Sequence, residues 1–139
     1  DNGLSNVMPK AQHSATDIVS LARQFMPTLA ADGTDVLSVY ERAGEAIARI
    51  RAGEGPMFLH CPTKRWMKHQ GHEPCDLAAA TLDRERDCPI HKLEKFLCRS
   101  GLATRAELAE IAADVESEVD AAVRFAEQSP FPTPELLEA

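Results

Sequence analysis

The sequence predicts an α/β fold with a partial parallel sheet, followed by a C-terminal helical segment. Two short apolar runs bounded by turn residues, at 28–31 and 57–61, are typical of buried strands. A helical pattern at 36–51 lies between them, and a strand, a crossover helix and a second strand form a parallel unit. Two strands are too few for a stable sheet, which indicates that the domain is incomplete.

The N-terminal part is predicted to hold one helix. Residues 1–14 are rich in turn formers and indicate an irregular loop. Ser14 is predicted to cap a helix over residues 15–25, which Pro27 ends. The first predicted strand, residues 28–31, follows directly.

A turn connects that strand to the second helix. Asp32 and Gly33 indicate the turn, and Thr34 or Asp35 is predicted to cap a helix over residues 36–51. Its apolar face is formed by Val36, Val39, Tyr40, Ala43, Ile47 and Ile50. A Gly-Glu-Gly-Pro sequence then ends the helix, and the second strand follows.

The last third of the chain is predicted to be helical. One helix begins at Pro89 and ends at Gly101. Thr104 and Glu107 form a capping box that opens a long amphipathic helix. We expect a single partial domain over residues 1–139, with a helix and strand part at 1–62, a loop-like segment at 63–87 and a helical tail at 88–139.

Charge and composition exclude several classes of protein. The net charge is −7, and the segment from residue 104 to the end holds nine acids against two arginines, which argues against nucleic-acid binding. The basic cluster at residues 64–68 is too small for a nucleic-acid surface. No apolar run is long enough to cross a membrane, and no signal peptide is visible. The four cysteines therefore indicate a reducing, cytoplasmic location.

Three segments, in order, carry a family resemblance. They are ADGTDVLSVYERAGEAIARIRAGEGP, CPTKRWMKHQGH and DCPIHKLEKFLCRSGLATRAELAEIAADVESEVDAAVRFAEQSPFP. These segments resemble the C-terminal portion of the alpha subunit of the thiamine-diphosphate-dependent dehydrogenases of 2-oxo acids and acetoin. The resemblance covers nearly the whole chain. It implies oxidative decarboxylation of a 2-oxo acid and transfer of the acyl group to a lipoyl carrier.

The resemblance also implies cofactors and partners. The family's motif for thiamine diphosphate and magnesium begins with Gly-Asp-Gly, which has no counterpart here, and ends in two asparagines, which Asp1-Asn2 would match. Asn2 then corresponds to a side-chain ligand of magnesium and Leu4 to a backbone ligand. We therefore expect the isolated chain to be inactive. Its expected partners are the missing N-terminal part of the subunit, a beta subunit and a lipoyl acyltransferase, in a homo- or hetero-oligomer.

The segment after the second strand is expected to contact the cofactor. By resemblance, Arg65 and His69 belong to a loop that orders over the diphosphate, with Arg65 binding its oxygens and His69 acting in catalysis as a proton donor. The alternative is that both are ordinary surface residues. The sequence departs from the family after His69, because the usual Ser and Tyr-Arg pair are replaced, which puts turnover and loop phosphorylation in question.

The same departures leave a metal site as an alternative. His72 and Cys75, separated by two residues, are followed at finger-like distance by Cys88 and His91 with the same spacing. Two such pairs are able to hold a tetrahedral zinc ion. A small zinc-stabilised or otherwise non-catalytic interaction module is therefore the second hypothesis from the sequence.

Overall fold

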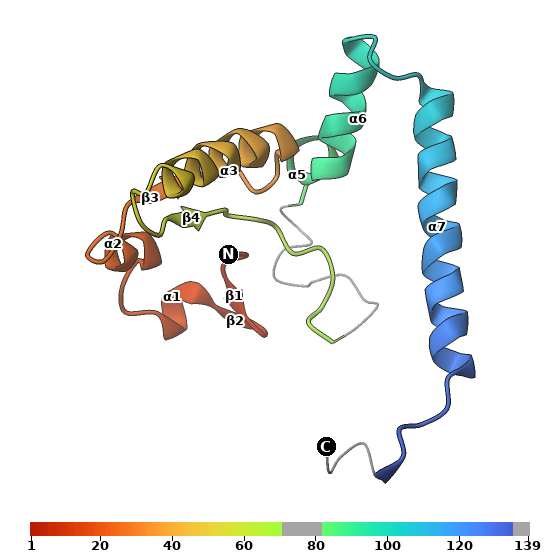
Figure 1. The fold of residues 1–139 in the computed structure, drawn as a ribbon, viewed down its shortest axis with the longest axis horizontal. Coiled ribbons are helices and arrows are strands. Elements are labelled where there is room, and N and C mark those ends of the chain that lie inside the picture. Colours follow the sequence, from red (N-terminus) through yellow and green to blue (C-terminus); the bar gives the residue numbers. More distant parts are fainter. Residues whose placement is uncertain (71–81, 135–139) are drawn as a thin grey trace. The chain divides into compact units, whose positions relative to one another are not determined.

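The computed structural model describes residues 1–70 and 82–134. The chain forms two compact units, Asp1–Phe96 and Leu97–Ala139. The first unit combines several helices with two small sheets, one antiparallel and one parallel (Figure 1). The predicted α/β class with a partial parallel sheet is confirmed.

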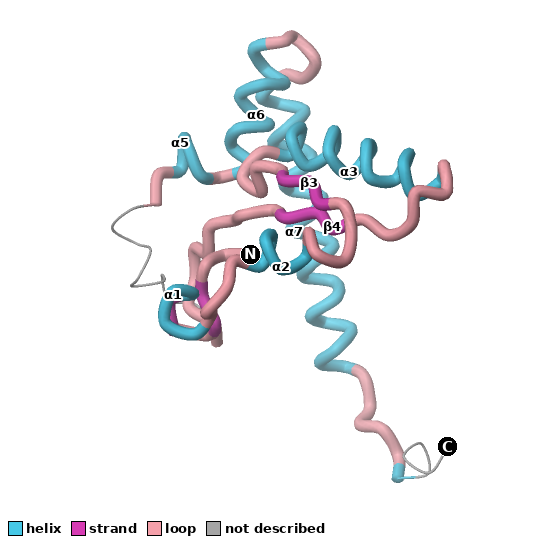
Figure 2. Tube along the Cα trace, turned by 90° about the vertical axis from the view of Figure 1, so that its left-hand side faces the viewer, coloured by secondary structure: helices cyan, strands magenta, loops and turns pink. Residues whose placement is uncertain are grey.

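The parallel sheet consists of β3 (Thr28–Ala30) and β4 (Phe58–His60). In its register, Thr28 lies opposite Phe58 and Ala30 opposite His60. The ladder continues beyond the strands, since the Ala31 amide donates to the His60 carbonyl at 3.0 Å. The predicted strands and their parallel pairing are confirmed. Figure 2 shows the two strands side by side.

The helix between these strands is α3 (Val36–Arg51), with the predicted bounds. The Asp35 carboxylate caps it by accepting hydrogen bonds from the Leu37 and Ser38 amides. The helix packs against both strands. Its buried residue is Ala46, whereas Tyr40 on the predicted apolar face is 78% exposed. The apolar face is therefore only partly covered within this unit.

The N-terminal residues are more regular than predicted. Two short strands, β1 (Leu4–Ser5) and β2 (Met8–Pro9), pair antiparallel, and α1 (Lys10–His13) follows. The Lys10 amide donates to the Gly3 carbonyl at 2.7 Å. Gly3 and Lys10 are thus a hydrogen-bonded pair, and the next pair, Leu4 and Pro9, is a non-bonded one. Pro9 fits there because no backbone donor is required at that position.

The cap of the next helix differs from the prediction. Asp17, not Ser14, caps α2 (Ile18–Ala22), and its carboxylate accepts a hydrogen bond from the Ser20 amide at 2.9 Å. The Ser14 hydroxyl instead donates to the Thr16 carbonyl at 2.8 Å. An aspartate caps a helix as well as a serine does, because its carboxylate accepts a hydrogen bond from a backbone amide of the first turn. With Asp17 in the cap position instead of Ser14, the helix begins later than predicted.

One short helix was not predicted. Asp83 caps α5 (Arg84–Asp87) through hydrogen bonds from the Glu85 and Arg86 amides. The helix α6 (Pro89–Arg99) follows after Cys88. One turn of helix is too short to show apolar periodicity, so the sequence carries no signal for α5.

The second unit is dominated by α7 (Arg105–Gln128). Gly101, with φ of +65°, ends the preceding helix, as predicted. The predicted capping box is confirmed, because the Thr104 hydroxyl accepts from the Glu107 amide while the Glu107 carboxylate accepts from the Thr104 amide. No residue of α7 is buried. Among the described residues, no helix has the length and apolar character required to span a membrane.

Candidate functional site

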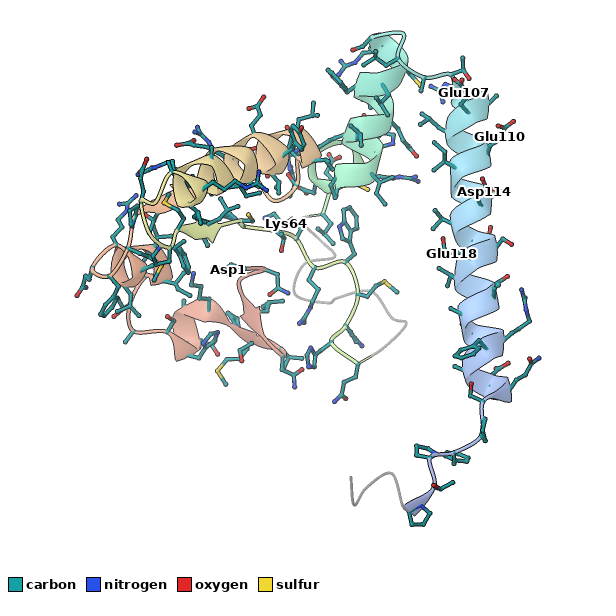
Figure 3. The ribbon with its side chains drawn as sticks, in the orientation of Figure 1. Asp1, Lys64, Glu107, Glu110, Asp114 and Glu118 are labelled. Carbon is teal, nitrogen blue, oxygen red and sulfur yellow. The ribbon has the colours of Figure 1, made fainter. Side chains whose placement is uncertain are left out.

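Asp1 lies beside the residues that directly follow β4. The Asp1 amine donates to the Cys61 carbonyl at 3.1 Å, and the Thr63 amide donates to the Asp1 carbonyl at 2.8 Å. These two bonds follow the pattern of a parallel strand pair centred on Pro62. Figure 3 shows Asp1 beside the extended segment that carries Lys64. The N-terminal residues therefore meet the carboxyl end of β4.

The Asp1 side chain links three parts of the chain. Its carboxylate accepts from the Gly3 amide at 2.9 Å, pairs with Lys10 Nζ at 2.5 Å and lies 3.0 Å from His60 Nε2. No pattern in the sequence groups Asp1, Lys10 and His60. Their meeting depends on the pairing of Asp1 with β4, across about sixty residues of chain. In the sequence itself, the only signals for this cluster are the aspartate at position 1 and a histidine at the end of a predicted strand.

A hollow opens beside this ion cluster. Its volume is about 490 Å³, and its lining is mixed, with the apolar side chains of Leu4, Ile18 and Phe58 and the polar side chains of Asp1 and His60. The hollow lies between the N-terminal segment and β4. A mainly apolar lining with a few polar groups is the usual make-up of a small-ligand site.

The side-chain oxygen of Asn2 and the carbonyl oxygen of Leu4 point away from the hairpin that β1 and β2 form. The Asn2 Oδ1 accepts a hydrogen bond from the Leu4 amide at 3.0 Å, which closes a tight local turn. Because Leu4 and Pro9 form a non-bonded pair, the Leu4 carbonyl also points away from β2. The structure therefore brings the two sequence-predicted magnesium ligands to one edge of the segment.

Gly33 lies against the start of the segment that follows β4 (residues 61–70, the post-β4 segment). A Cβ atom on Gly33 would lie 2.4 Å from the Pro62 carbonyl oxygen and 2.6 Å from Thr63 Cγ2. The predicted Asp-Gly turn is present. The glycine is required there by the close approach of the backbone of the post-β4 segment, and not by a left-handed conformation.

The Asp32–Thr34 turn is itself held by α6. The Asp32 Oδ1 accepts from both the amide and the hydroxyl of Thr34, at 2.8 and 2.7 Å. Lys92 Nζ donates to Thr34 Oγ1 at 2.8 Å and lies 3.4 Å from Asp32 Oδ2. The hydrogen bonds from Thr34, and then the nearby charge of Lys92, hold the pKa of Asp32 below its ordinary value.

The post-β4 segment carries the predicted contact residues. Arg65 and Trp66 are half-buried, whereas Lys64 and His69 are exposed. The positive charge of Lys64 also acts on Asp87 of α5. The roles of Arg65 and His69 toward a cofactor stay predictions.

Asp87, the last residue of α5, is a buried acid. Its side chain is buried and accepts hydrogen bonds from Arg86 Nη2 at 2.7 Å and from the Asp83 amide at 2.9 Å. The hydrogen bond from Arg86 first, and then that from the Asp83 amide, lowers the pKa of Asp87 to about 2. This acid therefore ties the last residue of α5 back to the cap residue of the same helix.

The structure describes two of the four residues of the alternative zinc site, Cys88 and His91. His72 and Cys75 lie outside the described residues. His91 Nε2 lies 2.7 Å from Glu85 Oε1, and His91 Nδ1 lies 3.7 Å from Glu94 Oε2, so both ring nitrogens face carboxylates. Within residues 1–70 and 82–134, no three or more His, Cys, Asp or Glu side chains gather as a metal-binding group.

Comparison with known proteins gives a consistent result. The sequence model of the family described as "Dehydrogenase E1 component" matches residues 3–135. Chloroplastic pyruvate dehydrogenase E1 component subunit alpha-3 of Oryza sativa subsp. japonica is 41% identical over 110 residues, which are 77% of this chain and 26% of that protein.

Two further relatives extend the similarity. The alpha subunit of acetoin:2,6-dichlorophenolindophenol oxidoreductase from Cupriavidus necator is 34% identical over 143 residues, covering 99% of this chain and 43% of that protein. The testis-specific mitochondrial pyruvate dehydrogenase E1 alpha subunit of Homo sapiens is 38% identical over 116 residues, covering 78% and 29%. The chain thus spans between about a quarter and two fifths of the length of these relatives.

Proposed function

The chain belongs to the dehydrogenase E1 component family, and on that premise we propose that it forms part of the alpha subunit of a thiamine-diphosphate-dependent 2-oxo acid dehydrogenase. The assembled enzyme would decarboxylate a 2-oxo acid oxidatively and pass the acyl group to a lipoyl carrier. One observation carries the proposal. Asp1, directly before the Asn2–Leu4 turn, is hydrogen-bonded to Cys61 and Thr63 of the post-β4 segment just past the carboxyl end of β4, where open α/β sheets bind their ligands.

Magnesium is proposed to bind at the N-terminal turn. Asn2 Oδ1 and the Leu4 carbonyl are hard oxygen donors, which magnesium prefers, and both lie on the edge that faces away from β2. Asn2 Oδ1 accepts one hydrogen bond and keeps a second lone pair for a metal. Two protein ligands fit the habit of magnesium to complete its shell with waters and phosphate oxygens.

Arg65 and His69 are proposed to act on the diphosphate side of the cofactor. When bound, thiamine diphosphate supplies the electron-accepting chemistry of the decarboxylation. Arg65 would bind diphosphate oxygens through its planar guanidinium group. His69, which is exposed at the end of the post-β4 segment, would donate a proton to the reacting carbonyl oxygen.

The proposal includes partner chains and a location. Partner chains would cover apolar side chains such as Phe25 and Tyr40, which are 75% and 78% exposed within the described chain. The partners proposed are the remainder of the alpha subunit, a beta subunit and a lipoyl acyltransferase. A cytoplasmic location is also proposed, and cell fractionation would test it.

Reconstitution tests this function. The chain would be combined with a beta subunit and an N-terminal alpha segment, and titrated with thiamine diphosphate and magnesium. Trp66, the chain's single tryptophan, lies in the post-β4 segment, so its fluorescence reports cofactor binding. We expect a saturable change that the Trp66→Phe variant lacks, together with turnover of pyruvate or a branched-chain 2-oxo acid. The isolated chain should show no turnover. A correctly assembled complex that neither binds the cofactor nor turns over would refute the proposal.

A further inference from the structure

The turn between β3 and α3 is held in one shape by its own hydrogen bonds. Asp32 Oδ1 accepts from the amide and the hydroxyl of Thr34, at 2.8 and 2.7 Å. The Asp32 amide donates to Ser38 Oγ at 3.0 Å, and the Asp32 carbonyl accepts from the Asp35 amide at 3.0 Å. Polar groups that are satisfied by one another stiffen the segment that carries them. A displacement at one residue of this turn is therefore passed to its neighbours.

Two other parts of the first unit contact this turn at adjacent residues. On one side, Lys92 Nζ of α6 donates to Thr34 Oγ1 at 2.8 Å. On the other side, a Cβ atom on Gly33 would lie 2.4 Å from the Pro62 carbonyl oxygen, so the backbones of the turn and of the post-β4 segment are in direct contact. The position of α6 and the position of the post-β4 segment are thus connected through two neighbouring residues.

The chemistry of the Lys92 contact makes it hard to replace. The Thr34 hydroxyl gives its single proton to Asp32 Oδ1, so its lone pairs accept the hydrogen bond from the ammonium group. The same ammonium lies 3.4 Å from Asp32 Oδ2. Because Thr34 is buried, water is a poor substitute for Lys92, and its loss leaves a buried acceptor without this donor.

We propose that Lys92 is a positioning residue, which acts through the Asp32–Thr34 turn to set the place of the post-β4 segment and so of Arg65 and His69. The inference rests on the proposed function for what Arg65 and His69 do, and on the contacts of the turn for where the segment lies. Without Lys92, the segment spends only part of its time in the arrangement that binds the cofactor. The apparent dissociation constant then rises by the inverse of that fraction.

The first test uses the free chain and needs no cofactor. Trp66, the chain's single tryptophan, is half-buried in the post-β4 segment, so its emission and its quenching by acrylamide report the place of that segment. Lys92→Met should move the emission to longer wavelength and increase the quenching. Lys95→Met is the matched control on the same helix. It removes an ion pair with Glu85 and should leave both signals unchanged.

Variants of Thr34 show whether Lys92 acts through the turn. Thr34→Val removes the hydroxyl at constant shape and should reproduce the change at Trp66, whereas Thr34→Ser keeps the hydroxyl and should match the wild type. Combining Lys92→Met with Thr34→Val should add nothing to the effect of Thr34→Val alone, as for two residues of one contact. Circular dichroism checks that every variant keeps its fold. Additive effects, or wild-type Trp66 signals in Lys92→Met, would overturn the inference.

The second test uses the reconstituted enzyme, with thiamine diphosphate and magnesium as the probe. Lys92→Met should raise the dissociation constant of the cofactor by about tenfold, while turnover at saturating cofactor stays within about twofold of the wild type, because saturation restores the binding arrangement. A lower turnover at an unchanged dissociation constant would show a loss of folded enzyme instead, and would contradict the inference. A wild-type complex that binds no cofactor would refute the proposed function, and the free-chain measurements would still decide whether Lys92 places the segment.

Discussion

A Cβ atom on Gly33 would lie 2.4 Å from the carbonyl oxygen of Pro62. The turn after β3 and the start of the post-β4 segment therefore touch backbone to backbone. A side chain at position 33 has no space unless one of the two segments moves.

The first prediction follows from this contact. Gly33→Ala should lower the free energy of unfolding by about 1–3 kcal/mol, as expected for overpacking against a rigid backbone. Gly44→Ala is the matched control. Gly44 lies inside α3 with nothing within 4 Å of its Cβ position, so the change should stabilise the chain by about 0.5–1 kcal/mol through helix propensity. Urea denaturation measures both. Equal effects of the two variants would contradict the close approach.

The second prediction concerns the lysine that holds the same turn. Lys92→Met removes the hydrogen bond to the buried Thr34 and should lower the stability by about 1 kcal/mol. Lys95→Met on the same helix removes an ion pair with Glu85, whose side chain is 61% exposed, and should have a smaller effect. Thermal unfolding compares the two. A larger loss for Lys95→Met would show that Lys92 does not hold the turn.

The third prediction is a dependence on acid. The pKa of Asp87 is lowered to about 2 from an ordinary value of 3.8. Because the folded form binds the proton more weakly, Asp87 contributes stability that is fully present above about pH 4 and is lost as the pH falls toward 2. Denaturation measured between pH 5 and 2 should show this loss. Asp87→Asn should flatten the profile in that range, whereas Asp120→Asn, on exposed α7, should leave it unchanged.

The fourth prediction tests the role of His69. In the reconstituted enzyme, His69→Ala should reduce the turnover rate by about a hundredfold or more, the usual effect of losing a general acid. His91→Ala is the control, since that histidine lies on α6 between Glu85 and Glu94 and should matter little to turnover. Steady-state kinetics give both values. Similar rates for the two variants would remove His69 from the mechanism.

The sequence predicted the elements that have strong local signals. Both α3 and α7 begin where a capping residue precedes apolar residues at helical spacing. The cap is Asp35 for α3 and the Thr104–Glu107 capping box for α7. The strands β3 and β4 are apolar runs between turns, and their parallel pairing followed from the helix between them. The family resemblance, carried by the order of these segments, is confirmed over residues 3–135.

The missed features depend on contacts between distant residues or on competing local bonds. The β1–β2 hairpin has only two residues in each strand, which is too short for a periodic pattern. The cap at Asp17 competed with the equally plausible Ser14. The grouping of Asp1 with His60 arises from strand pairing, which no local pattern encodes. Arg65 and His69 were chosen by resemblance alone, and their roles stay predictions.

The position of Asp1 beside β4 has a consequence for amide hydrogen exchange. The Phe58 amide donates to Pro27, on the β3 side of the strand, whereas the Thr63 amide donates to Asp1, on the opposite side. Each amide exchanges with solvent only when its own hydrogen bond opens. Phe58 and Thr63 therefore report separately, within one short stretch of backbone, on whether the sheet is paired and whether the N-terminal residues are in place.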